Sequence, residues 1–253
     1  VFICKLLLYY VIIRVWQNKT SIMNIYHRYL DLPFNIKKPS VVKTTDNIDE
    51  NIKKGGCGLP ECVDRCQFGS ITACYDKSFW DNIRGDLQIN EDNMQNFLDK
   101  FGLFSDNPLY FWNKPGDNLH IHVDNNKETG YFKKERKPTD FIDDHAKINI
   151  TWGPIESKMQ WWTADDDAVK MGEEKDDDGN IWNILYAKEK DCELVYEKTI
   201  SRPSLVNGGR LHSVINPSKI EGRLTQSFNI VSKSELETVK FNEALEIFKQ
   251  YVL

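Results

Sequence analysis

Residues 119–126, LHIHVDNN, place two histidines and an aspartate at alternate positions of a predicted β-strand. Side chains alternate between the two faces of a strand, so His120, His122 and Asp124 are expected on one face. Imidazole nitrogens and carboxylate oxygens are common metal ligands. The stretch therefore predicts a metal site, and it leaves open which of the three residues bind the ion.

Two kinds of metal enzyme carry such a stretch. The HxHxDH motif of metallo-β-lactamase-type hydrolases matches until its last position, where Asn125 stands in place of a histidine. That fold also needs helices between its strands, which this sequence does not predict. The second kind uses two histidines and one carboxylate on one face of Fe(II), which leaves three coordination positions open for substrate and O2. His122 and Asp124 would supply two of these ligands, and a later strand must supply the third.

The distant ligand is predicted to be His212, in GGRLHSVINP, because His145 lies in the polar stretch DDHAK at the start of a strand. Arg223 and Thr225 follow in EGRLTQSFNI and share a strand face because they are two residues apart. A guanidinium can bind a carboxylate through two parallel hydrogen bonds, and a hydroxyl can add a third. A small dicarboxylate that chelates iron at one end and meets Arg223 at the other would bridge these groups, which indicates 2-oxoglutarate.

The order H-x-D, then PSLVN followed by HSVIN, then R-x-T on the final strand resembles the 2-oxoglutarate/Fe(II)-dependent oxygenase superfamily. The resemblance covers about residues 108–232. It is greatest to uncharacterised oxygenase-like proteins of phages and marine metagenomes, and more distant to prolyl and aspartyl/asparaginyl hydroxylases. The family implies a double-stranded β-helix fold, Fe(II) as the metal and 2-oxoglutarate as co-substrate.

The resemblance also implies a role for individual side chains. The implied iron ligands are His122, Asp124 and His212. Arg223 would bind the distal carboxylate of 2-oxoglutarate, with Thr225 assisting, and Asn149 in KINITWG would face the co-substrate. His120 is left over, and we assign it a supporting role in which it lines the site or bonds a neighbouring residue.

The implied activity is hydroxylation of a C–H bond in an unidentified substrate, with conversion of 2-oxoglutarate and O2 to succinate and CO2. The substrate class stays open among a protein side chain, an amino acid and a small metabolite. Two other functions also stay open. One is a non-catalytic cupin-like module that binds a metal or another ligand, and the other is a viral structural or assembly protein built on a jelly roll.

The elements that must position these residues begin near residue 108, where short segments rich in β-branched and aromatic residues are bounded by Gly, Pro, Asn or acidic runs. Strands without intervening helices favour a mainly-β fold, here a cupin-like jelly roll with flanking helices. Helices are expected at 90–104, where Asn90 is the N-cap, and at 239–253. The eight expected strands are 119–124, 146–153, 158–164, 180–187, 192–200, 203–208, 210–216 and 223–231.

The domain organisation is expected to have four parts. Residues 1–22 are an apolar extension outside the fold, residues 23–107 a lead-in and helical region, residues 108–232 the catalytic core, and residues 233–253 a C-terminal helix packed on that core. The first methionine is Met23, where we expect the working protein to begin. A membrane anchor is the alternative for the extension, although its uninterrupted apolar run is shorter than the roughly 20 residues that span a bilayer.

Composition excludes some partners and leaves one cluster unexplained. The net charge is −5 over 253 residues and no basic stripe occurs, so nucleic-acid binding is not expected, nor is stable membrane association. We expect a cytoplasmic protein, with a phage or virus as one candidate source. Four cysteines are spaced C-x4-C-x3-C-x7-C, which fits zinc sites poorly and favours free thiols in a reducing compartment, with a structural zinc site and disulfides as the alternatives: Cys57, Cys62, Cys66 and Cys74.

Overall fold

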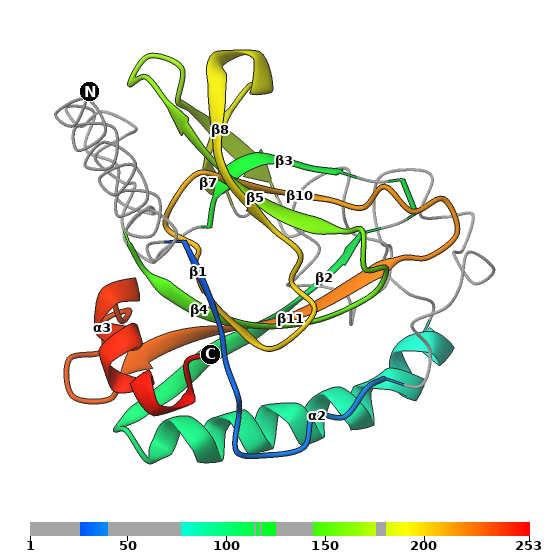
Figure 1. Cartoon of the computed structure of the whole chain (residues 1–253), viewed down its shortest axis with the longest axis vertical. Helices are drawn as coiled ribbons and strands as arrows, with labels where there is room; N and C mark the ends of the chain where they lie inside the picture. The colour runs from blue at the N-terminus through cyan, green and yellow to red at the C-terminus, as the bar shows by residue number, and fades with distance from the viewer. Residues whose placement is uncertain (1–25, 40–76, 114, 117, 125–143, 176–180) are drawn as a thin grey trace, which may run out of the picture.

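The structure is a computed structural model that describes residues 26–39, 77–113, 115–116, 118–124, 144–175 and 181–253. The expectations for residues 1–22 and for the cluster of four cysteines lie outside these ranges. The strands are β1 His27–Tyr29, β2 Leu103–Asn113, β3 Asn118–Val123, β4 Ala146–Trp152, β5 Lys158–Ala164, β6 Lys170–Lys175, β7 Ile181–Ala187, β8 Cys192–Lys198, β9 Ser204–Asn207, β10 His212–Ile215 and β11 Arg223–Ser232. The α-helices are α2 Lys77–Asp99 and α3 Phe241–Ile247, with 3-10 turns at Glu189–Asp191 and Lys249–Tyr251 (Figure 1).

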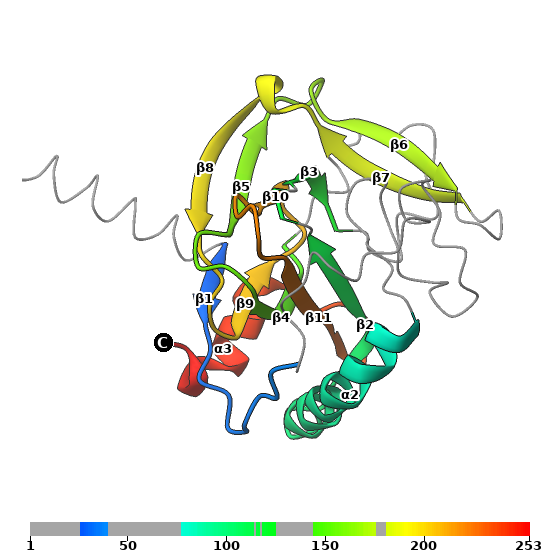
Figure 2. The same ribbon diagram turned by 90° about the vertical axis from the view of Figure 1, so that its right-hand side faces the viewer.

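Two antiparallel sheets face each other, so the expectation of a mainly-β fold with flanking helices is confirmed. The five-stranded sheet has the order β1-β9-β4-β11-β2, and the six-stranded sheet has the order β6-β7-β3-β10-β5-β8. Figure 2 shows them as two layers, with α2 and α3 on the outer side of the five-stranded sheet. In the described ranges, no helix combines the length and the apolar character needed to cross a membrane.

The strands pair in a nested order. β2 pairs with β11, β3 with β10, β4 with β9, and β5 with β8, each time antiparallel. The chain therefore passes through β2, β3, β4 and β5 in order, and the later strands β8 to β11 pair with them in reverse order. The hairpin of β6 and β7 is added beside β3. This arrangement sets the two histidine-bearing strands, β3 and β10, side by side although they are distant in the sequence.

The five-stranded sheet has two chemically different faces. Its outer face packs against the helices, where Ile148 and Phe228 join Phe97 of α2 and Phe248, just after α3, in one apolar core. The alternate residues of β4 and β11 face the other sheet and are polar, yet they are buried: Lys147, Asn149, Arg223, Thr225 and Ser227. Burying polar groups between two sheets costs free energy unless they find partners, so this inner face indicates a site rather than a simple core.

All eight expected strands are present, and three others were missed. β2 runs across the domain boundary expected at residue 108, and its pattern is interrupted at Asp106, Asn107 and Pro108. Its partner β11 shifts register between Ser227 and Asn229, opposite that interruption. Proline lacks a backbone N–H, so it is tolerated at such an edge strand and bulge. β1 is only three residues long, and β6 is a charged edge strand.

The first helix differs from its expected bounds of 90–104. α2 begins at Lys77 and ends at Asp99, before Gly102, whose φ of 69° turns the chain into β2. Asn90 is not a cap. It is buried in mid-helix, where its side chain accepts a hydrogen bond from the backbone N–H of Lys37 and donates one to the same residue's carbonyl, at 2.8 and 2.9 Å. The helix therefore anchors the lead-in segment against the five-stranded sheet.

Candidate metal centre

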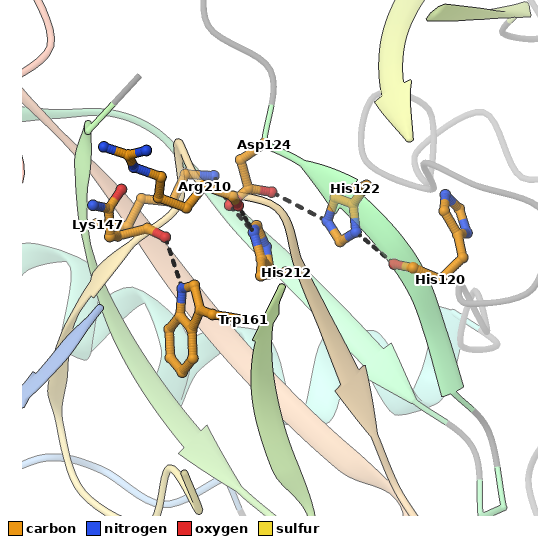
Figure 3. Close-up of polar contacts among 8 residues, drawn as sticks. His120, His122, Asp124, Lys147, Trp161, Arg210 and His212 are labelled. Carbon is orange, nitrogen blue, oxygen red and sulfur yellow. Dashed lines mark hydrogen bonds and ion pairs between the residues drawn. The ribbon is translucent and has the colours of Figure 1, made fainter. Parts of the chain in front are cut away.

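The antiparallel pairing of β3 with β10 places His122 opposite His212, with 4.4 Å between their ring centroids. Asp124 follows β3, and its backbone N–H donates a hydrogen bond to the carbonyl of Gly208 at 3.1 Å. Its Oδ1 lies 3.5 Å from Nε2 of His122, and its Oδ2 lies 3.5 Å from Nε2 of His212 (Figure 3). The three ligand atoms all lie within 4.8 Å of one another, so this group could hold a metal ion.

Both imidazoles are oriented by the backbone. Nδ1 of His122 lies 2.8 Å from the carbonyl oxygen of His120, and Nδ1 of His212 lies 2.8 Å from that of Arg210. A carbonyl only accepts, so each Nδ1 donates a proton to it, and Nε2 is the ring nitrogen that lies near Asp124. Backbone hydrogen bonds of this kind fix the tautomer of metal-binding histidines. Burial lowers the pKa of His212 to about 3, which keeps its ring neutral.

The carboxylate of Asp124 is ionised because of a neighbouring lysine. Burial opposes ionisation of Asp124, but the ammonium of Lys147 is the largest of the contributions that hold its pKa well below the usual range. Nζ of Lys147 lies 2.8 Å from Oδ2, and the lysine side chain is 2% exposed. Lys147 was not predicted from the sequence, although it occupies an inward position of the expected strand 146–153. A charged residue at such a position is the signal that could have identified it.

Gly208 makes room for this cluster. A Cβ at this position would lie 2.8 Å from Oδ2 of Asp124, 3.1 Å from Nε2 of His145 and 3.1 Å from Cδ of Lys147. His145 is buried beside the centre, but the group of three candidate ligands does not include it. The first glycine of GGRLH is therefore a position that a side chain cannot occupy without moving the carboxylate.

His120 departs from the expectation that it shares a regular strand face with His122 and Asp124. His212 pairs with His122, but Val214 pairs with Leu119, so β3 carries one extra residue at this point. Such a bulge breaks the alternation of side chains. His122 is buried whereas His120 is exposed, with 5.6 Å between the two ring centroids. The bulge therefore separates a buried histidine at the centre from an exposed histidine at its edge.

The predicted co-substrate residues lie on the inner face of the five-stranded sheet. Arg223 is 2% exposed, and its Nη1 donates a hydrogen bond to Oδ1 of Asn113 at 3.3 Å. No carboxylate among the described residues pairs with it, and burial lowers its pKa to about 10. Thr225 is buried with its Oγ1 3.0 Å from that of Thr151, and Oδ1 of buried Asn149 has no hydrogen-bond partner among the described residues.

Other cationic and aromatic side chains take different positions. Arg210 forms an ion pair with Asp144 through contacts of 2.6 and 2.9 Å, whereas Arg202 is exposed. Trp161 is fully buried and donates from Nε1 to the carbonyl of Asn207 at 3.0 Å. Trp162 follows a register shift and packs with a separate apolar cluster of the six-stranded sheet.

Comparisons with known proteins do not assign a family. No known family model matches the sequence, and a search of curated proteins finds no match. Among solved structures, peruvianin-I, a cysteine peptidase from Thevetia peruviana latex, aligns with 85% of this chain and 94% of its own. The identity is 9% and the TM-score 0.23, which carries no argument about fold or chemistry. The function must therefore be inferred from the site itself.

Proposed function

We propose that this chain is a 2-oxoglutarate/Fe(II)-dependent oxygenase that hydroxylates a C–H bond of its substrate. Bound Fe(II) and 2-oxoglutarate would supply the oxidising chemistry: one oxygen atom of O2 enters the substrate, and the other converts 2-oxoglutarate to succinate and CO2. His122, Asp124 and His212 would hold the iron.

The fold supports this proposal. A jelly roll is a long hairpin rolled into two sheets, so that its first strand pairs with its last and each inner strand with its counterpart. The four nested pairs, from β2 with β11 to β5 with β8, follow that pattern. We therefore interpret the two sheets as a double-stranded β-helix, with the candidate metal centre between them.

The observation that carries the proposal is the buried guanidinium of Arg223. It lies on the face of β11 that is turned toward the six-stranded sheet, and within the described residues its side chain hydrogen-bonds the neutral amide of Asn113. A buried cation without an anionic partner is costly, and a carboxylate of a bound ligand would offset that cost. The unbonded oxygen of Asn149 lies on the same face, which adds a second polar group available to a ligand.

The residues of the site would have separate roles. The two imidazoles would offer Nε2 to the metal because hydrogen bonds to the backbone hold their Nδ1 atoms. Arg223 would orient the co-substrate through its distal carboxylate, with the hydroxyl of Thr225 beside it. The sheets exclude water from this space, because Arg223 and Thr225 are each only 2% exposed. Exclusion of water protects a reactive oxidant from side reactions.

The test is anaerobic reconstitution with Fe(II) and 2-oxoglutarate, followed by visible absorption for the weak iron-to-2-oxoglutarate charge-transfer band that the resemblance implies. We expect the band in the wild type and its loss in His212→Ala and Asp124→Ala. His27→Gln is the matched control, because His27 is a buried histidine that hydrogen-bonds Ser204 and lies outside the candidate metal centre. Persistence of the band in both alanine variants would refute the ligand assignment.

Two outcomes would point to the other functions. If the wild type binds Fe(II) but Arg223→Ala binds 2-oxoglutarate equally well, a non-catalytic cupin-like binding module is favoured. If the purified wild type binds no divalent metal, a structural or assembly jelly roll is favoured. Formation of succinate that depends on both Fe(II) and O2 separates the oxygenase from both.

A further inference from the structure

The carboxylate of Asp124 stands between the two imidazoles in a nearly symmetric position. Each of its oxygens lies 3.5 Å from an Nε2, Oδ1 from that of His122 and Oδ2 from that of His212. By these distances alone, the carboxylate could offer an ion either one oxygen or both. Lys147 breaks the symmetry, because its Nζ contacts Oδ2 at 2.8 Å.

We propose that Lys147 is a positioning residue that restricts Asp124 to one metal-binding oxygen, Oδ1. This inference rests on the proposed function and specifies how the centre keeps room for its reactants. The lysine is held firmly in place, since it comes from β4 on the opposite sheet and its side chain is 2% exposed. Its Cδ would lie 3.1 Å from a Cβ at Gly208, so its stem packs over the glycine.

Charge explains the selection of the oxygen. A divalent ion bound through Oδ2 would stand close to the ammonium on that same oxygen, and like charges repel strongly where solvent is excluded. Binding through Oδ1 avoids that repulsion and leaves the hydrogen bond from Lys147 intact. The ammonium also stabilises the ionised form of Asp124 that a metal requires.

The consequence is the number of open coordination positions. Two imidazoles and a monodentate carboxylate leave three positions of a six-coordinate ion open. A carboxylate bound through both oxygens would leave two. A chelating 2-oxo acid takes two positions and O2 needs one more, so the proposed reaction requires the monodentate arrangement.

The test uses Mn(II) as the probe and the relaxation of water protons to measure how many waters each bound ion carries. We expect Lys147→Met to lower the enhancement of the water-proton relaxation rate per bound Mn(II) by about one third, because three open coordination positions become two. Lys147→Arg keeps a cationic donor and should restore the wild-type value. Lys233→Met is the control, because Lys233 pairs with Asp99 at the exposed surface at 2.7 Å.

A second comparison asks whether Lys147 acts through Asp124. In Asp124→Asn the side chain offers one oxygen, so adding Lys147→Met should leave the relaxation unchanged. If Lys147→Met does not fold, as judged by urea unfolding, Lys147→Gln replaces it. The glutamine side chain is shorter and neutral, so we expect it to lower the relaxation enhancement as Lys147→Met does.

The outcomes separate this inference from the proposed function. If the wild type binds no Mn(II), both fail. If it binds Mn(II) and Lys147→Met gives the wild-type relaxation, only the role of Lys147 is refuted. An equal drop in the Asp124→Asn background would also refute it, because the lysine would then act on the ion by another route.

Discussion

Arg223→Met is expected to stabilise the ligand-free protein although it removes a residue of the proposed site. Burial lowers the pKa of Arg223 from its ordinary value to about 10, a difference of about 2.5. At about 1.4 kcal/mol for each pKa unit, burying the charged form costs roughly 3 kcal/mol. The hydrogen bond to Asn113 returns about 1 kcal/mol. The variant should therefore gain about 2 kcal/mol in its free energy of unfolding.

The sign and the pH range follow from the direction of this shift. A base whose pKa is lower in the folded state destabilises the fold wherever it is charged in both states, which here means below about pH 10. The increase in the free energy of unfolding caused by Arg223→Met should have its full size at pH 7 and should shrink as the pH rises above 10. Urea unfolding measures it directly, and for a domain of this size it corresponds to a rise in Tm of roughly 4–8 °C.

Lys147→Met is the matched comparison, because it removes the other buried cation of the same sheet face. Lys147 is paired with Asp124, and breaking a buried ion pair typically costs about 3–5 kcal/mol. The two methionine variants should therefore shift stability in opposite directions. Destabilisation by Arg223→Met of similar size would show that an acidic group of the chain already neutralises Arg223. The space beside it would then not be a carboxylate site.

Two further predictions concern the packing of the centre and the pH dependence of the fold. Gly208→Ala should weaken Mn(II) binding by about 10- to 100-fold, because its Cβ would lie 2.8 Å from Oδ2 of Asp124. Binding is measured by the EPR signal of free Mn(II), with Gly85→Ala as control because nothing lies within 4 Å of a Cβ there. Burial lowers the pKa of His27 to about 3, so stability should fall as the pH drops from about 6.5 toward 3. Urea unfolding at pH 7 and pH 5 measures this loss, and His27→Gln should reduce it by about 2 kcal/mol, while buried His212 keeps part of the loss in the variant. An equal loss of unfolding free energy in the wild type and the variant would contradict this.

The strands of the core could be predicted because their sequences are locally consistent. β5 occupies the bounds expected for KMQWWTA, and β11 those of RLTQSFNIV with one residue added. Their β-branched and aromatic residues fit a strand whichever sheet they join. β2 could not be found in this way, because Asp106 and Pro108 are acceptable only at the edge position that pairing with β11 gives them.

The candidate site was predictable in its ligand types but not in its details. The order of His122, Asp124 and His212 along the chain identified a group that the structure brings together. The bulge at His120 depends on the register between β3 and β10, which no local pattern determines. The ion pair of Lys147 with Asp124 joins the two sheets, so it could be recognised only once the sheets were packed.

The nested strand pairing also has a consequence for the order of folding. The innermost pair, β5 with β8, joins nearby segments, whereas the outermost brings Asn113 beside Arg223, 110 residues away. Loop-closure entropy increases with that separation, so we expect the inner pairs to form first and the outer pair last. His122 and His212 lie on the third pair and Arg223 on the fourth. An ion could thus bind a partly folded chain before the carboxylate site exists, and stopped-flow refolding with and without Mn(II) would detect this as a metal-dependent early phase.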